Sequence, residues 1–497
     1  MDLGLKKADA HATCEAEGLA LASSGQNESP LREIVAAQAR RKTDWIIVPM
    51  ASLMFLFCFI DRANIGNARL ADFESNLGLQ GNDFNSVNSI FYISYILFEI
   101  PAVILCKKMG PAWFLPLITV LFGLVSIASG WVQNYPQLAG TRFALGIAEC
   151  GLMPGLSYYL SRWYTRAELT FRLSIYISMA AVSGAIGGLL ASGILKIQHF
   201  GNFGASSWRT IFVLEGIVTV AIGLAALAVL PDRPETAYFL TSTEKHVVVG
   251  RIMAERPHAG GAIDKMSTKK LWRGVANPVT IATAIIFMLE SVTVNGLGFF
   301  APTIVKTIFP DKTVIQQQLL TVPPYVVGTA SVITVCWFSW HFKTRQIFII
   351  IFVTPVMAGY LIFLVTLNSV ARYIATFLIA SSAFTLGALC HGQAAANVNS
   401  DSARSMAIAV TMFFGNIGSL ISTWAFQSWD GPEYHIGNGL NFATSSAIVI
   451  IGSLVLFFMR WDNRRRDRMN VEEEFVDLSD EEIQNLEWKH PSFRWRP

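Results

Sequence analysis

Charged side chains inside long apolar stretches are the residues of this sequence best suited to do chemistry. Asp61 and Arg62 are adjacent in FIDRANIGNAR, and Arg142 and Glu149 lie seven residues apart in RFALGIAECGLMPGLSYYLSRWY. The others are Glu99, Glu215, Glu290 and His391. Because an ionisable side chain at the centre of a membrane span costs about 2.5–3.5 kcal/mol to insert, it usually faces a cavity or a partner. These residues are therefore candidates for binding an anion and carrying a proton.

The two arginines allow two interpretations each. Arg62 either faces a cavity and binds an anion, with Asp61 modulating its charge, or extends to the outer membrane surface with Asp61 as its partner. Arg142 and Glu149 share one helical face, about 10 Å apart along the axis. They either join neighbouring helices or couple substrate to proton, because burial favours the protonated form of a carboxyl and a nearby cation favours the charged form.

Three further intramembrane residues have weaker signals. Glu99 is followed by Pro101, which kinks a helix and frees a carbonyl. Glu290 precedes Asn295 and two glycines, a pattern that indicates either a flexible gate or close helix packing. His391 near the end of its apolar run fits a packed, hydrogen-bonded residue better than a proton relay.

The elements that must position these residues are membrane-spanning helices. The chain has 497 residues, of which 53% are hydrophobic and 15% charged, and its mean hydropathy is +0.44. A soluble protein is usually about 25% charged, and apolar runs of about 20 residues have the length that a helix needs to cross a bilayer. We expect twelve spans, at 45–65, 85–106, 113–132, 136–160, 173–195, 209–230, 278–300, 319–340, 346–367, 372–394, 405–427 and 439–460.

A basic insert at 231–277 separates the first six spans (45–230) from the last six (278–460), and polar tails occupy 1–44 and 461–497. If the N-terminus is cytoplasmic, the cytoplasmic segments hold 25 Lys and Arg, against 7 on the other side. Both tails and the insert are therefore predicted to be cytoplasmic. The pattern predicts an all-α membrane protein with the major facilitator fold, twelve transmembrane helices in two six-helix halves, with spans 1, 4, 7 and 10 lining a central cavity.

The sequence from about residue 44 to 460 resembles the anion:cation symporter branch of the major facilitator superfamily, most closely the fungal allantoate permease-like transporters. The matching stretches are DRANIGNAR, the RFxLGxxExGxxPGxxYYLSxWY pattern, WRTIFVLEG at 208–216 and VPPY at 322–325. The cytoplasmic stretch KKMGPAWF keeps only a remnant of the superfamily's glycine-rich motif. The span-5 glycines lack the proline typical of drug antiporters, which favours uptake over drug export.

The resemblance assigns roles to individual residues. It implies substrate contact by Arg62, Tyr95, Arg142 and Asn397, proton coupling by Asp61 and Glu149, and a cytoplasmic gate at Arg404. Two positions depart from the family: Glu99 stands where bacterial members have glutamine, and Glu290 occupies a span in which organic-anion relatives have arginine. We keep Glu99 and Glu290 as gating or secondary polar residues.

The predicted function is secondary active transport: proton-coupled symport of a small organic carboxylate, such as a vitamin or an allantoate-like nutrient, across the plasma membrane by a monomer. Export of a secondary metabolite is the alternative, and a nutrient sensor on a carrier fold is a more distant one. No G-x-x-x-x-G-K-[ST] motif is present, and no cysteine pair has metal-ligand spacing. A net charge of +3 does not suggest nucleic-acid binding. We therefore expect no enzyme, cofactor or metal site.

Overall fold

The computed structural model describes residues 30–195, 207–254, 268–342, 344–398, 401–468 and 487–497, which form α-helices and short 3-10 turns without a strand among them. Ten helices of this part of the chain are long and apolar enough to cross a membrane. They are α2 (Pro30–Arg69), α4 (Asp83–Met109), α5 (Pro111–Ser129), α8 (Arg166–Ile194), α9 (Ser207–Val229), α12 (Pro278–Ile308), α13 (Val314–Phe342), α14 (Gln346–Val365), α15 (Ser369–Ala396) and α17 (His435–Arg466). Predicted spans 4 and 11 are occupied by the pair α6 (Tyr135–Glu149) and α7 (Leu152–Ser161) and by α16 (Asp401–Ser422).

Span 4 is two helices, whereas we expected one helix over 136–160. The helix ends at Glu149 and resumes at Leu152. Pro154 explains the break, because proline lacks an N–H and its ring clashes with the carbonyl four residues earlier, here that of Cys150. Gly151 at the break lies against the ring of Phe114 on α5, where an added Cβ would come within 2.7 Å. The break makes Glu149 the last residue of α6.

The helix of span 1, α2, begins at Pro30, well before residue 45, where we expected this span to start. Its polar extension is tied to α8 and to α10 (Ser242–Ala254), a helix of the central insert. Arg40 and Arg251 each lie 3.0 Å from the carboxylate of Glu168, and Lys42 lies 2.8 Å from that of Glu244. Burial opposes ionisation of Glu168, but hydrogen bonds from Arg251 and Arg40 outweigh it and hold the pKa of this carboxyl below its usual value.

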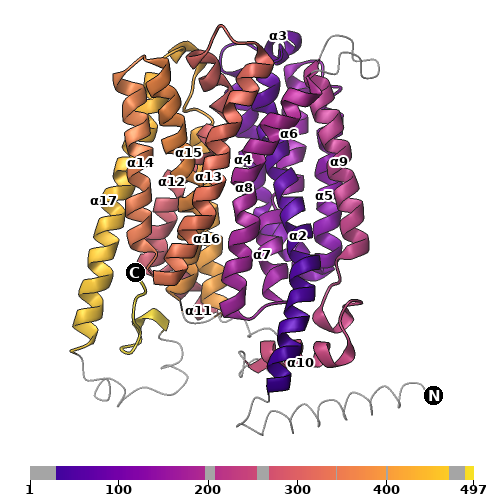
Figure 1. Ribbon diagram of the computed structural model, residues 1–497, viewed down its shortest axis with the longest axis vertical. Helices are drawn as coiled ribbons and strands as arrows, with labels where there is room; N and C mark the ends of the chain where they lie inside the picture. Colours follow the sequence, from indigo (N-terminus) through magenta and orange to yellow (C-terminus); the bar gives the residue numbers. More distant parts are fainter. Residues whose placement is uncertain (1–29, 196–206, 255–267, 343, 399–400, 469–486) are drawn as a thin grey trace.

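The two halves of the chain stand side by side, with α2 to α9 on the right of Figure 1 and α12 to α17 on the left. They meet through α8 on α13, α2 on α12 and α4 on α16. Glycine permits the closest approaches: a Cβ on Gly184 would lie 2.4 Å from the ring of Tyr325, and one on Gly66 would lie 2.4 Å from the carbonyl oxygen of Phe299. The VPPY motif and the span-5 glycines thus pack against each other.

Hydrogen bonds join the two halves at the end of the helix bundle that is uppermost in Figure 1, near α3 (Phe73–Leu77). Asn85 at the start of α4 donates to the carbonyl of Thr423 at 2.6 Å. Ser89, one turn further, lies 2.8 Å from the Thr423 hydroxyl and accepts from the indole of Trp424 at 2.8 Å. The contacts run from this end toward the middle of the bundle, where Asn416 of α16 donates to Glu99 at 2.9 Å.

Candidate functional site

A cavity of about 90 Å³ lies between the halves. The N-terminal half lines the cavity with α2, α4, α7 and α8, and the C-terminal half lines it with α12, α15 and α16. The four spans that we expected here, 1, 4, 7 and 10, correspond to α2, α7, α12 and α15. The other three helices belong to spans 2, 5 and 11. Its polar lining residues are Arg62, Tyr95, Glu99, Glu290, Ser291, Asn295, His391, Asn416 and Ser419. Since ligand pockets usually measure about 300–1,000 Å³, a substrate needs the halves to move apart.

Arg62 provides a positive charge on the N-terminal wall of this cavity. Its Nε donates to Glu149 Oε2 at 2.6 Å. The guanidinium also lies over the rings of Phe59, Phe91 and Tyr95, with its central carbon 5.0, 5.4 and 4.9 Å from the ring centroids. Cation–π attraction holds such a group while leaving it able to bind an anion.

Glu149 is fully buried and does not line the cavity. Besides Arg62, its Oε2 accepts a weak hydrogen bond from the thiol of Cys58 at 3.3 Å. Its other oxygen, Oε1, has no hydrogen-bond partner among the described residues. The ion pair therefore joins spans 1 and 4 directly behind the cavity wall.

Asp61 lies inside the N-terminal half, away from the cavity. It accepts from the hydroxyls of Ser126 on α5 at 3.0 Å and Thr219 on α9 at 3.4 Å. Consecutive helical residues point about 100° apart, so Asp61 and Arg62 face different neighbours. The interpretation in which Asp61 is the partner of Arg62 at the outer surface is wrong, because Glu149 is that partner.

Arg142 is also buried, 2% exposed, and lies outside the cavity lining. Its guanidinium stands 5.6 Å from the centroid of Phe212, and within the described chain its Nε and Nη2 lack hydrogen-bond partners. Glu149 and Asp61 are the carboxylates that act on it electrostatically. The carboxylate of Glu149, which we expected to act together with Arg142, is paired with Arg62 in this conformation.

Three other predicted residues do line the cavity. Glu99 accepts from Asn416, and Glu290 on α12 is 3% exposed. The ring of His391 packs at 4.6 Å against Phe287, and its Nδ1 lies 2.8 Å from the carbonyl of Gly387, which fits the packed role that we expected.

Asn397 and Arg404 lie away from this cavity. Asn397, at the end of α15, donates to the carbonyl of Arg496 at 3.2 Å and accepts from its amide at 2.8 Å. Arg404 Nε donates to the carbonyl of Ala395 at 3.2 Å. Neither residue is placed to touch a molecule in the cavity, and their predicted roles as substrate contact and gate gain no support from this arrangement.

Asn416 is a lining residue that sequence reasoning missed, and Asn295 is one that it assigned only to a flexible gate. Tyr92 donates to Asn295 Oδ1 at 2.8 Å, and Asn295 in turn donates to Ser419 at 2.8 Å. The sequence signal that could have identified both residues is an asparagine inside an apolar run, because its amide needs hydrogen-bond partners within the bundle.

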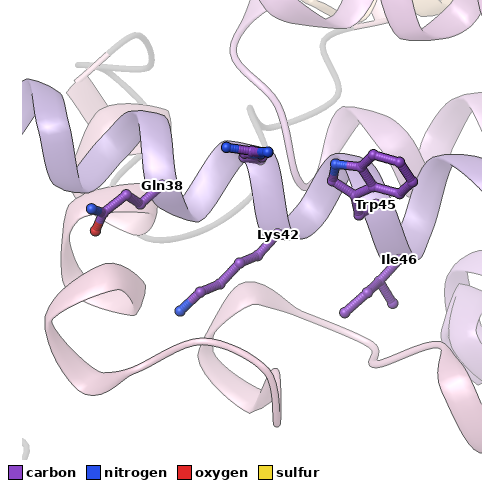
Figure 2. Close-up of a pocket in the computed structure, with 5 residues that line it drawn as sticks. Gln38, Lys42, Trp45 and Ile46 are labelled. Carbon is purple, nitrogen blue, oxygen red and sulfur yellow. The ribbon is translucent and has the colours of Figure 1, made fainter.

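A second depression lies on the surface of α2 and is lined by Gln38, Arg41, Lys42, Trp45 and Ile46 (Figure 2). All five residues come from one helix, and Trp45 is 73% exposed. Tryptophan beside basic residues is typical of a membrane–water interface. Because all the described residues that line this depression come from one helix, we take the cavity between the halves as the candidate site.

Fungal proteins that are named as transporters are similar in sequence to this chain. The chain is 32% identical over 436 residues to Uncharacterized transporter C1683.12 of Schizosaccharomyces pombe, covering 88% of each chain. It is 31% identical to MFS-type transporter efuF of Hormonema carpetanum, covering 90% of this chain and 91% of that one.

Solved structures with this fold include the proton:xylose symporter XylE, with a TM-score of 0.65 at 16% identity over 84% of this chain and 94% of that one. Another is an inward-facing bacterial homologue of the human lysosomal transporter Spinster, with a TM-score of 0.61 at 13% identity over 87% and 97% of the two chains. The Major Facilitator Superfamily family model matches residues 51–423. The predicted fold and superfamily are confirmed: this chain belongs to the Major Facilitator Superfamily and is a multi-pass membrane transporter, not an enzyme.

Proposed function

We propose that this transporter carries a small organic carboxylate by proton-coupled symport, as expected of an allantoate permease-like member of the anion:cation symporter branch. One observation carries the proposal: the cavity arginine, Arg62, is paired at 2.6 Å with a fully buried carboxylate on another helix. An incoming substrate carboxylate is chemically equivalent to that of Glu149 and competes with it for the same guanidinium.

Competition for Arg62 supplies a physical link between substrate and proton. If the substrate draws Arg62 away, Glu149 is left as a buried anion, which costs about 3–5 kcal/mol when a buried pair loses one partner. Binding a proton removes that charge. The halves then rock about the cavity with substrate and proton both bound, and release at the other side restores the Arg62–Glu149 pair.

Arg142 is the second cation that bears on this exchange, and we predict that Arg142→Gln changes the pH profile of uptake as well as its rate. With Arg62 engaged by substrate, Arg142 is the remaining buried cation that acts on Glu149 and Asp61. Uptake measured across pH and normalised to surface protein tests this. If Arg142 only holds helices together, the variant will express poorly and its residual uptake will keep the wild-type profile.

The proposed function is tested by uptake in cells that lack their own carriers, using labelled nicotinate, pantothenate, biotin and allantoate. We expect at least one of them to accumulate under an outside-acid gradient and to stop accumulating when a protonophore collapses that gradient. Net efflux of the label would favour the exporter alternative, and accumulation that ignores the gradient would contradict proton symport. The basic connections support an orientation in which α10 and α11 (Thr268–Val275) lie on the cytoplasmic side. Cell fractionation checks the plasma-membrane location.

A further inference from the structure

We propose that Glu290 favours substrates that carry an ammonium group at the end opposite their carboxylate, so that a small zwitterion binds more tightly than the matching acid without an amino group. This inference rests on the proposed function, because it takes the carboxylate end to bind at Arg62. The ammonium would bind at the C-terminal wall of the cavity, opposite Arg62.

The partners of the three carboxylates in and beside the cavity distinguish Glu290. Glu149 is paired with Arg62, and Glu99 accepts from the amide of Asn416. Glu290 is 3% exposed and lines the cavity, yet among the described residues no hydrogen bond or ion pair reaches it. Its carboxyl is therefore a buried polar group that is aimed into the cavity without a protein partner.

The surroundings of Glu290 leave room for a ligand group. Gly387 on α15 faces it: an added Cβ there would stand 3.5 Å from Glu290 Oε1 and 3.5 Å from the ring of Phe287. His391, one turn further along α15, directs its Nδ1 to the carbonyl of Gly387 instead. The space beside the carboxyl is thus bordered by a glycine and an aromatic ring, and no basic side chain of the described chain pairs with it.

The charges on the two walls are complementary to the two ends of a zwitterion. Arg62 belongs to α2 in the N-terminal half, and Glu290 belongs to α12 in the C-terminal half. A buried carboxylate gains most from a ligand that brings a charged donor, since charge-assisted hydrogen bonds are roughly twice as strong as neutral ones. A molecule that binds both walls also draws the halves together, so its recognition favours closure around it.

The test compares matched acids with and without an amino group: propionate with β-alanine, butyrate with 4-aminobutyrate, and hexanoate with 6-aminohexanoate. Binding to the purified full-length transporter is measured by calorimetry. In at least one pair we expect the amino member to bind 10-fold or more tightly to the wild type, and Glu290→Gln to reduce that preference to below 3-fold. Glu215→Gln is the matched control, because Glu215 is buried on α9 with both oxygens unpartnered in the described chain but lies outside the cavity lining.

Each outcome separates this inference from the proposed function. Equal binding of both members of every pair to the wild type overturns the zwitterion inference and leaves carboxylate transport standing. An amino preference that survives in Glu290→Gln also overturns it, as does equal loss of both members in that variant, which would mark a structural role. If the wild type binds no acid of any pair, the zwitterion inference fails, whereas the carboxylate assignment still depends on the uptake test with nicotinate, pantothenate, biotin and allantoate.

Discussion

Arg62→Ala should abolish carboxylate uptake, lowering it at least 100-fold, on the order of 3 kcal/mol of lost binding, while protein still reaches the membrane. Among the described residues that line the cavity, Arg62 is the only arginine, and no lysine accompanies it. Its planar guanidinium can bind a carboxylate through two N–H groups while aromatic rings hold it in place. Arg62→Lys should restore little uptake, because a point charge does not reproduce that fork. Initial uptake rates per surface transporter measure both variants.

The Arg62→Ala variant needs one control, because it also leaves the buried carboxylate of Glu149 without its ion-pair partner. The double variant Arg62→Ala/Glu149→Gln removes the orphaned charge and should recover thermal stability in detergent. If Arg62 binds substrate, the stable double variant still fails to bind any carboxylate. Near-normal substrate affinity in either variant would show that the anion binds elsewhere.

Glu149→Gln should separate exchange from accumulation. Glutamine keeps the shape of a protonated Glu149, and the pair with Arg62 is lost, so the variant resembles the proton-loaded carrier permanently. It should lose gradient-driven accumulation by 10-fold or more yet continue to exchange internal for external substrate, because exchange requires no net release of a proton.

Two assays on the same proteoliposomes check this prediction. Accumulation is measured under an imposed pH gradient, and counterflow is measured with label outside and unlabelled substrate inside. Asp61→Asn provides a comparison, because Asp61 is also buried in the N-terminal half but its partners are the hydroxyls of Ser126 and Thr219. If Glu149→Gln still concentrates substrate in a pH-dependent way while Asp61→Asn does not, the coupling proton belongs to Asp61.

Composition and charge along the chain predicted the fold class and most of the charged residues that line the cavity. Bilayer thickness sets the length of an apolar helix, so span positions can be read from composition along the chain. The cost of inserting a charge then singles out residues such as Arg62, Glu99 and Glu290, all of which line the cavity. The break in span 4 was not predicted, although its cause is local, because Pro154 acts on its own helix, four residues earlier in the chain.

Which charged residues form pairs depends on how the helices pack against one another. Because Asp61 and Arg62 are adjacent in sequence, one interpretation paired them. On a helix, however, adjacent residues point about 100° apart and have different neighbours. Arg62 instead forms its ion pair with Glu149, 87 residues away in sequence. Asn397 likewise forms hydrogen bonds to the backbone of Arg496, 99 residues further along the chain, and lies away from the cavity. Helix spans follow from local composition, whereas ion pairs and cavity walls depend on how separate helices cross, which local sequence patterns do not encode.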